Sequence, residues 1–75
     1  MIDHEKNLRK AIELSKQSID SGSSPFGCVI VDAEGKIVGE GHNRVAPDND
    51  PTAHGEVVAI RNACRNLGTF DLSGC

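Results

Sequence analysis

The sequence predicts an α/β protein in which two helices pack on a β-hairpin, in the order helix, strand, strand, helix. Apolar residues recur at three- and four-residue spacing near both ends of the 75-residue chain, which is typical of amphipathic helices. Between them lie two short runs rich in β-branched residues, separated by a glycine-containing turn sequence. The chain has no internal repeat and no linker, so it represents one small domain or part of one.

The first helix is predicted over Asp3 to Asp20. The residues expected on its buried face, at three- and four-residue spacing, are Leu8, Ala11, Ile12, Ser15 and Ile19. The SGSSP segment that follows combines glycine, serine and proline, and therefore ends the helix.

The hairpin is predicted from Phe26 to Asp32 and from Ile37 to His42, with a tight turn over Ala33 to Lys36. Gly39 and Gly41 exclude a helix in the second run, and glycine inside a strand indicates a bulge or a close approach of another backbone.

The second helix is predicted to follow a polar loop over Asn43 to Asp50, with Thr52 as its N-cap and Gly68 as its end. Its apolar side chains cover more than one narrow stripe, so the helix is expected to be largely covered; they are Val57, Val58, Ile60, Ala63, Cys64 and Leu67. The final TFDLSGC segment begins to resemble an extended strand.

The composition excludes several classes of protein. The formal charge is −3 and there is no run of Lys or Arg, so nucleic acid is not an expected partner. No apolar run is long enough to cross a membrane, and the N-terminus lacks the apolar core of a signal peptide, which predicts an intracellular, cytoplasmic protein. The three cysteines are therefore expected to be reduced.

His54 and Glu56 are placed at the predicted start of the second helix, where both side chains can reach the open end of the helix axis. Unpaired N–H groups and a partial positive charge at that end favour an anion such as a metal-bound hydroxide. Imidazole is a common zinc ligand, and a carboxylate outside the ligand set can transfer protons from zinc-bound water. Capping and compensation of the helix dipole would select the same two residues, so a structural role stays open at this point.

Four blocks of the chain add to the pattern formed by His54 and Glu56. They are PFGCVIV, GEGHNRV, NDPTAHGEVVAIRNAC and LGTFDLSGC. In order and spacing they resemble successive blocks of the cytidine deaminase-like superfamily, and most closely its bacterial guanine deaminases. The resemblance implies a three-layer α/β/α sandwich, of which residues 1–75 would be the N-terminal part of a single domain of the CMP/dCMP deaminase type. It also implies a zinc-dependent hydrolysis of guanine to xanthine and ammonia, and a homodimer.

The resemblance also implies roles for individual residues. His54 matches the zinc-ligand histidine, and Glu56 matches the glutamate that carries a proton from zinc-bound water to the ring nitrogen and then to the departing ammonia. Asn43 matches an asparagine that hydrogen-bonds the base, although it could instead cap a turn. The backbone N–H of Gly55 is expected to face the substrate. Phe26 falls beside the pocket, where it packs on the ring or serves as simple core.

The chain departs from the family pattern because it contains no P-C-x-x-C motif, which supplies two zinc ligands in nucleobase deaminases. Cys64 follows His54 by ten positions, about 15 Å along a helix, and cannot share its metal. Cys28 is expected to be a buried thiol, and Cys75 would open a third strand. With one zinc ligand and the proton carrier, the chain is expected to be incomplete, or inactive alone.

Two other functions remain open. The chain could act on another base, because cytosine deaminases share the HGE form and tRNA adenosine deaminases share DPTAH. It could also be a non-catalytic assembly module. The acidic charge disfavours an RNA substrate.

Overall fold

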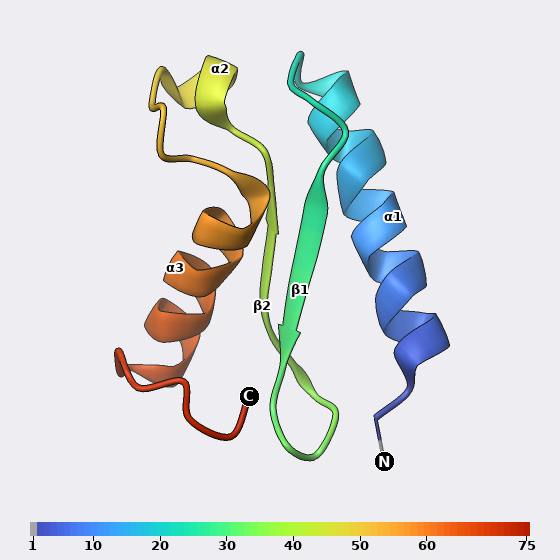
Figure 1. Cartoon of the computed structure of the whole chain (residues 1–75), viewed down its shortest axis with the longest axis vertical. Helices are drawn as coiled ribbons and strands as arrows, with labels where there is room; N and C mark the ends of the chain where they lie inside the picture. Colours follow the sequence, from blue (N-terminus) through green and yellow to red (C-terminus); the bar gives the residue numbers. More distant parts are fainter. Residues whose placement is uncertain (1) are drawn as a thin grey trace.

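The computed structural model describes residues 2–75 and places two helices on opposite faces of a two-stranded antiparallel hairpin (Figure 1). The elements are α1 His4–Asp20, β1 Gly27–Val31, β2 Ile37–His42, α2 Val45–Asp48 and α3 Gly55–Leu67. The three layers are therefore α1, the hairpin and α3. This confirms the predicted α/β order of helix, strand, strand, helix, with α2 as an addition.

The first helix begins at an N-cap, Asp3, whose carboxylate accepts a hydrogen bond of 3.0 Å from the Lys6 backbone N–H. Its end at Asp20 is as predicted, but its buried face is not. Leu14 and Ser18 are buried, whereas Leu8, Ile12 and Ile19 are more than half exposed; these three belonged to the predicted stripe. The helix is thus rotated by about one residue relative to the prediction.

A close backbone approach explains this rotation. A Cβ atom built on Gly27 would lie 2.2 Å from the Ala11 carbonyl oxygen and 2.8 Å from the Ser15 N atom. The strand therefore contacts the backbone of α1 directly, which only the side of the helix with small residues permits. The larger apolar side chains of the neighbouring stripe point elsewhere.

The hairpin turn is closed by Asp32, whose carboxylate accepts hydrogen bonds from the N–H groups of Glu34 and Lys36. Gly35 lies at φ 87°, a backbone conformation that favours glycine. The pairing shifts by one residue between Ile30 and Val31, as in a β-bulge, and this shift does not fall at the Gly41 position where a bulge was one of the predicted alternatives.

The third layer packs on β2 through small residues. Cβ atoms built on Gly39 and Gly41 would lie 2.6 Å from the Ala59 carbonyl oxygen and 2.5 Å from the Ala59 N atom. Ala59 and Ala63 are completely buried there. The predicted close approach at the two glycines is confirmed, and it fixes the distance between α3 and the sheet.

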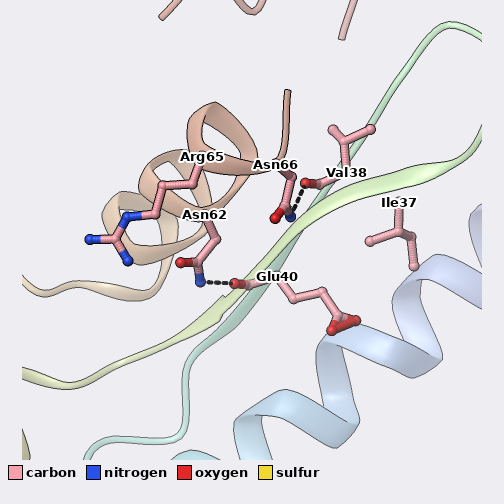
Figure 2. A pocket seen from close by; sticks show the side chains of 7 residues that line it. Ile37, Val38, Glu40, Asn62, Arg65 and Asn66 are labelled. Carbon is pink, nitrogen blue, oxygen red and sulfur yellow. Dashed lines mark hydrogen bonds between the residues drawn. The ribbon is translucent and has the colours of Figure 1, made fainter. Parts of the chain in front are cut away.

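The free edge of β2 is also held by α3. Figure 2 shows the side-chain amides of Asn62 and Asn66 donating to the carbonyl oxygens of Glu40 and Val38, each at 2.8 Å. Arg65 shares the shallow groove, of about 470 Å³, that runs along this edge. Two backbone acceptors that another strand would need are therefore occupied by the helix.

Two predictions about α3 were wrong. Thr52 is not the N-cap, because its N–H and hydroxyl both bond the Asp50 carboxylate in a turn, and α3 starts at Gly55. The helix is not largely covered, since Ile60 and Leu67 are 45% and 44% exposed.

The extended segment predicted at the end of the chain was also wrong. Residues 69–75 form hydrogen-bonded turns and no strand, because the side chains of Thr69 and Asp71 accept hydrogen bonds from nearby N–H groups. Among the described residues, no helix is long and apolar enough to cross a membrane.

Candidate active site

Three of the five predicted site residues, Phe26, Asn43 and Gly55, meet where β2 leaves the sheet and α3 begins, and the other two flank Gly55 in the chain. Gly55 is the centre of this arrangement, because a Cβ atom built on it would lie 3.3 Å from the Phe26 carbonyl oxygen and 3.6 Å from the Asn43 N atom. His54 and Glu56 are its neighbours in sequence. The end of the hairpin and the first turn of α3 therefore form one continuous surface.

His54 is the N-cap of α3, with φ −68° and ψ 154°, and its side chain makes no capping hydrogen bond. Glu56 lies in the first helical turn, and both side chains are exposed. The capping interpretation of His54 is therefore not supported. A carboxylate in this turn is also favoured by the partial positive charge of the helix start.

Asn43 is 8% exposed and lies on the last hydrogen bond of the hairpin, from its own N–H to the Phe26 carbonyl oxygen at 3.1 Å. Its side-chain oxygen accepts a hydrogen bond of 3.1 Å from the Val45 N–H, which begins α2. Capping a turn, one of the two predicted roles, is thus confirmed. This bond also shows which end of the Asn43 amide is the oxygen, because only the oxygen can accept a hydrogen bond. The nitrogen Nδ2 is therefore left as a donor for a ligand.

Phe26 precedes β1 and is 61% exposed, so it does not belong to the core formed by the described residues. Its backbone carbonyl oxygen accepts the hydrogen bond from Asn43 and lies beside Gly55, while the residue itself is exposed. An exposed aromatic ring is suited to packing on a planar ligand.

The loop between β2 and α3 is shaped by two carboxylates. Asp48 bonds the guanidinium of Arg44 at 2.8 to 3.0 Å, and this bond lowers the pKa of Asp48. Bonds from Thr52 lower the pKa of Asp50 in the turn just before His54. The predicted loop over residues 43–50 is therefore partly helical, with Pro47 in the first turn of α2, where a missing N–H costs little.

Two residues near the site were not predicted to be there. Cys28 pairs with Gly41 and so faces α3; burial, and then the negative charge of Glu56, raise the pKa of its thiol. Ser18 reaches the Asn43 carbonyl oxygen from α1. Strand pairing brings Cys28 toward Glu56, and the packing of α1 brings Ser18 to Asn43, so no local motif could have indicated them.

A metal ion would need more ligands than this surface provides. Within residues 2–75, no three side chains of His, Cys, Asp or Glu lie close enough together to hold one. Cys28 and Cys64 are partly buried and Cys75 is exposed. His54 is a suitable zinc ligand by type, but the described residues do not form a zinc site by themselves.

Comparisons with known proteins identify the family of the chain. The family described as the cytidine and deoxycytidylate deaminase zinc-binding region matches residues 1–75. Guanine deaminase of Bacillus subtilis (strain 168) is 47% identical over 75 residues, which cover 99% of this chain and 47% of that protein. A tRNA-specific adenosine deaminase of Aquifex aeolicus (strain VF5) is 44% identical over 68 residues, which cover 91% of this chain and 44% of that protein.

A solved structure of guanine deaminase from Bacillus subtilis superposes with a TM-score of 0.86 at 47% identity, and covers 95% of this chain and 45% of that chain. The present chain thus spans about half the length of the curated relatives that it matches. Because the family match extends over all 75 residues, and relatives of 44% and 47% identity share it, the chain belongs to the cytidine and deoxycytidylate deaminase family.

Proposed function

We propose that the protein at its full length is a guanine deaminase, which hydrolyses guanine to xanthine and ammonia. The observation that carries the proposal is the packing of Gly55, next to Glu56 at the start of α3, against Asn43, whose side-chain nitrogen is free to donate. The 47% identity to a guanine deaminase over the whole chain supports the choice of base.

In this proposal each site residue has one task. The Nδ2 donor of Asn43 binds an acceptor on the edge of the base, and the ring of Phe26 packs on its face. Glu56 holds and moves the proton that the leaving amine requires. The buried contact of Gly55 with the hairpin keeps these three groups together.

His54 would contribute one ligand to the zinc ion of the family. The described residues do not complete that ligand set. The tasks given above are those of this chain's own side chains and backbone. The proposal also includes a cytoplasmic homodimer that takes a small nucleobase and binds neither membrane nor nucleic acid.

The substrate is tested by comparing guanine, cytosine and adenosine in a tRNA stem-loop as substrates of the full-length protein, followed by the release of ammonia. Guanine is expected to give the highest kcat/KM. Asn43→Ala is expected to lower it by more than roughly tenfold, because a polar edge of the bound base loses its partner. Asn7→Ala, on α1, is the matched control. Unchanged kinetics in Asn43→Ala would remove this residue from the site.

A tRNA adenosine deaminase is the second candidate, because a relative with that activity is 44% identical over 91% of this chain. The net charge of −3 opposes it, since binding to a polyanion draws on clustered Lys and Arg. Faster turnover of the stem-loop than of guanine would select this candidate, and faster turnover of cytosine would make the protein a cytosine deaminase. If the protein turned over none of these bases, the non-catalytic assembly module would be the remaining hypothesis.

A further inference from the structure

Ser18 is a completely buried polar residue in the last turn of α1, and nothing in the proposed reaction uses it. Its Oγ lies 2.5 Å from the Ser24 carbonyl oxygen and 3.1 Å from the Asn43 carbonyl oxygen. Both neighbours are acceptors, so the hydroxyl shares its single hydrogen between them. A buried hydroxyl of this kind is retained because it satisfies backbone acceptors that have no access to water.

The same residue also fastens the segment that leads into β1. The Ser18 carbonyl oxygen accepts hydrogen bonds of 2.9 Å from the Ser23 N–H and from the Ser21 hydroxyl. The end of α1, the following turn and the end of β2 therefore share one junction. A shift at Ser18 would be transmitted to the residue that follows β2, which is Asn43.

Asn43 is held from three directions. Its N–H donates to Phe26, its side-chain oxygen accepts from Val45, and its carbonyl oxygen accepts from Ser18. The ring nitrogen Nδ1 of His42 also lies 3.2 Å from that carbonyl oxygen. Because these contacts set both the peptide plane and the side-chain rotation of Asn43, they also set the direction in which Nδ2 points.

We infer that Ser18 is a positioning residue: its hydroxyl fixes the peptide of Asn43 from the α1 side, and so orients the Nδ2 donor toward the base. The role of Nδ2 toward a base rests on the proposed function. The fixing of the Asn43 peptide does not, because it depends only on the hydrogen bonds of the chain itself.

The first test reads that geometry without any substrate. Nitrogen-15 NMR spectra record the side-chain amide of Asn43 and the exchange of the Val45 N–H hydrogen with solvent. Ser18→Ala is expected to shift the Asn43 amide signals and to speed the Val45 exchange by roughly tenfold, since the Asn43 carbonyl oxygen is then left with His42 alone as a side-chain neighbour. Ser15→Ala is the control on the same helix, because the Ser15 hydroxyl bonds only the Ile12 carbonyl oxygen, at 2.6 Å.

The exchange rate of the Val45 N–H is compared with the rates of backbone amides in α3. A general loss of stability would accelerate all of these amides equally. If Ser18→Ala does not fold, Ser18→Cys takes its place, because its thiol leaves no cavity and is a weaker donor, although it is slightly larger than the hydroxyl. A folded variant in which Asn43 and Val45 behave as in the wild type, or in which all amides accelerate equally, would overturn the inference.

The second test uses guanine and the full-length protein. Ser18→Ala is expected to raise KM by roughly tenfold while the pH profile of kcat stays unchanged, since the base loses a well-oriented donor and the proton carrier is untouched. A fall in kcat with KM unchanged would contradict the inference. A wild type that does not consume guanine would refute the proposed function alone, because the NMR measurement still decides the role of Ser18.

Discussion

At the scale of single residues, the site depends on the absence of a side chain at Gly55. A Cβ atom there would lie 3.3 Å from the Phe26 carbonyl oxygen, a contact that an alanine could make only with a small adjustment of the hairpin. Larger side chains would push the start of α3 away from Asn43. The neighbours His54 and Glu56 are exposed, so their positions are set by the backbone on which Gly55 packs.

Glu56→Gln preserves the size of the side chain and removes its ability to exchange protons. In the full-length protein we expect turnover of guanine to fall by about 10²–10⁴-fold, the range typical of one general acid–base group. The zinc content, measured by elemental analysis, is expected to stay constant. Loss of zinc together with activity would make Glu56 a ligand or a structural residue instead.

Glu56→Gln also tests whether the Glu56 carboxylate faces the thiol of Cys28. Its thiol has a raised pKa, first because of burial and then because of the charge of Glu56, and only the thiolate is alkylated. Removing that charge lowers the pKa, so iodoacetamide should modify Cys28 faster in Glu56→Gln at a mildly alkaline pH. Cys64 should react at an unchanged rate. Equal rates for Cys28 in both proteins would show that Glu56 does not face it.

The residues of the site differ in how well the sequence predicts them. His54, Gly55 and Glu56 are adjacent in the chain, so any helix that begins here brings them together. Asn43 depends on the strand pairing that ends at Phe26, and Ser18 acts across a separation of 25 residues. Such long-range contacts follow from the packing of elements, which a local pattern of residue types does not contain.

At the scale of elements, α3 and β2 lie unusually close because glycines in the strand face alanines in the helix. Gly41→Ala would place a Cβ atom 2.5 Å from the Ala59 N atom, and backbone cannot move aside as a flexible side chain can. We expect the free energy of unfolding to fall by about 1–3 kcal/mol, the usual cost of overpacking. Urea denaturation followed by circular dichroism measures this loss.

Gly55→Ala is the matched control for this variant, because its nearest contact of 3.3 Å can be relieved by a small shift. A helix position also gains stability when alanine replaces glycine. The two effects oppose each other, so its urea midpoint should lie close to that of the wild type. A Gly41→Ala protein as stable as Gly55→Ala would mean that α3 and β2 are farther apart than these contacts imply.

The boundaries of the elements were easier to predict than the rotation of the helices. The end of α1 at Asp20, the turn around Gly35 and the end of α3 at Gly68 follow from residue types with strong local preferences. In α1, the contact with Gly27 involves Ala11, Leu14 and Ser15, so the predicted stripe is met at its small residues while its large residues are exposed. The helical turn of α2 depends on the ion pair of Arg44 with Asp48 and on the hydrogen bond from the Val45 N–H to the Asn43 side chain. A polar stretch that contains proline does not indicate these contacts.

At the scale of the whole molecule, the described chain carries the proposed site residues on a small framework. Its core contains few large side chains: Leu14 and Val38 are buried, while Phe26 and Phe70, the only aromatic residues, are exposed. Domains of this size bury only about 60% of their unfolded surface, so they are marginally stable.

The 75-residue chain by itself is expected to purify without stoichiometric zinc and to show no deaminase activity. One imidazole and water ligands provide far less than the roughly 10–16 kcal/mol that a full set of protein ligands gives a structural zinc. Elemental analysis after dialysis measures the metal. About one tightly held zinc per chain that His54→Ala removes would require further ligands, from a partner chain or from a rearrangement of this one.

The amides of Asn62 and Asn66 give the sheet two unequal edges. On β2 the carbonyl oxygens of Val38 and Glu40 are already bonded to α3, whereas the outer edge of β1 pairs with no strand among the described residues. A fibre grows only if each molecule offers two open edges, one for each neighbour. With a single open edge, strand pairing between copies stops at two.

Light scattering at micromolar concentration should therefore detect a dimer of the 75-residue chain and no larger species. Replacing both asparagines, in Asn62→Ala/Asn66→Ala, should release the second edge and give higher oligomers, while Arg65→Ala in the same groove should not. A clean monomer in the wild type would refute the dimer. In this prediction, two side-chain amides close one edge of the sheet, so that self-association would be finite and a protein with an open strand edge would not polymerise.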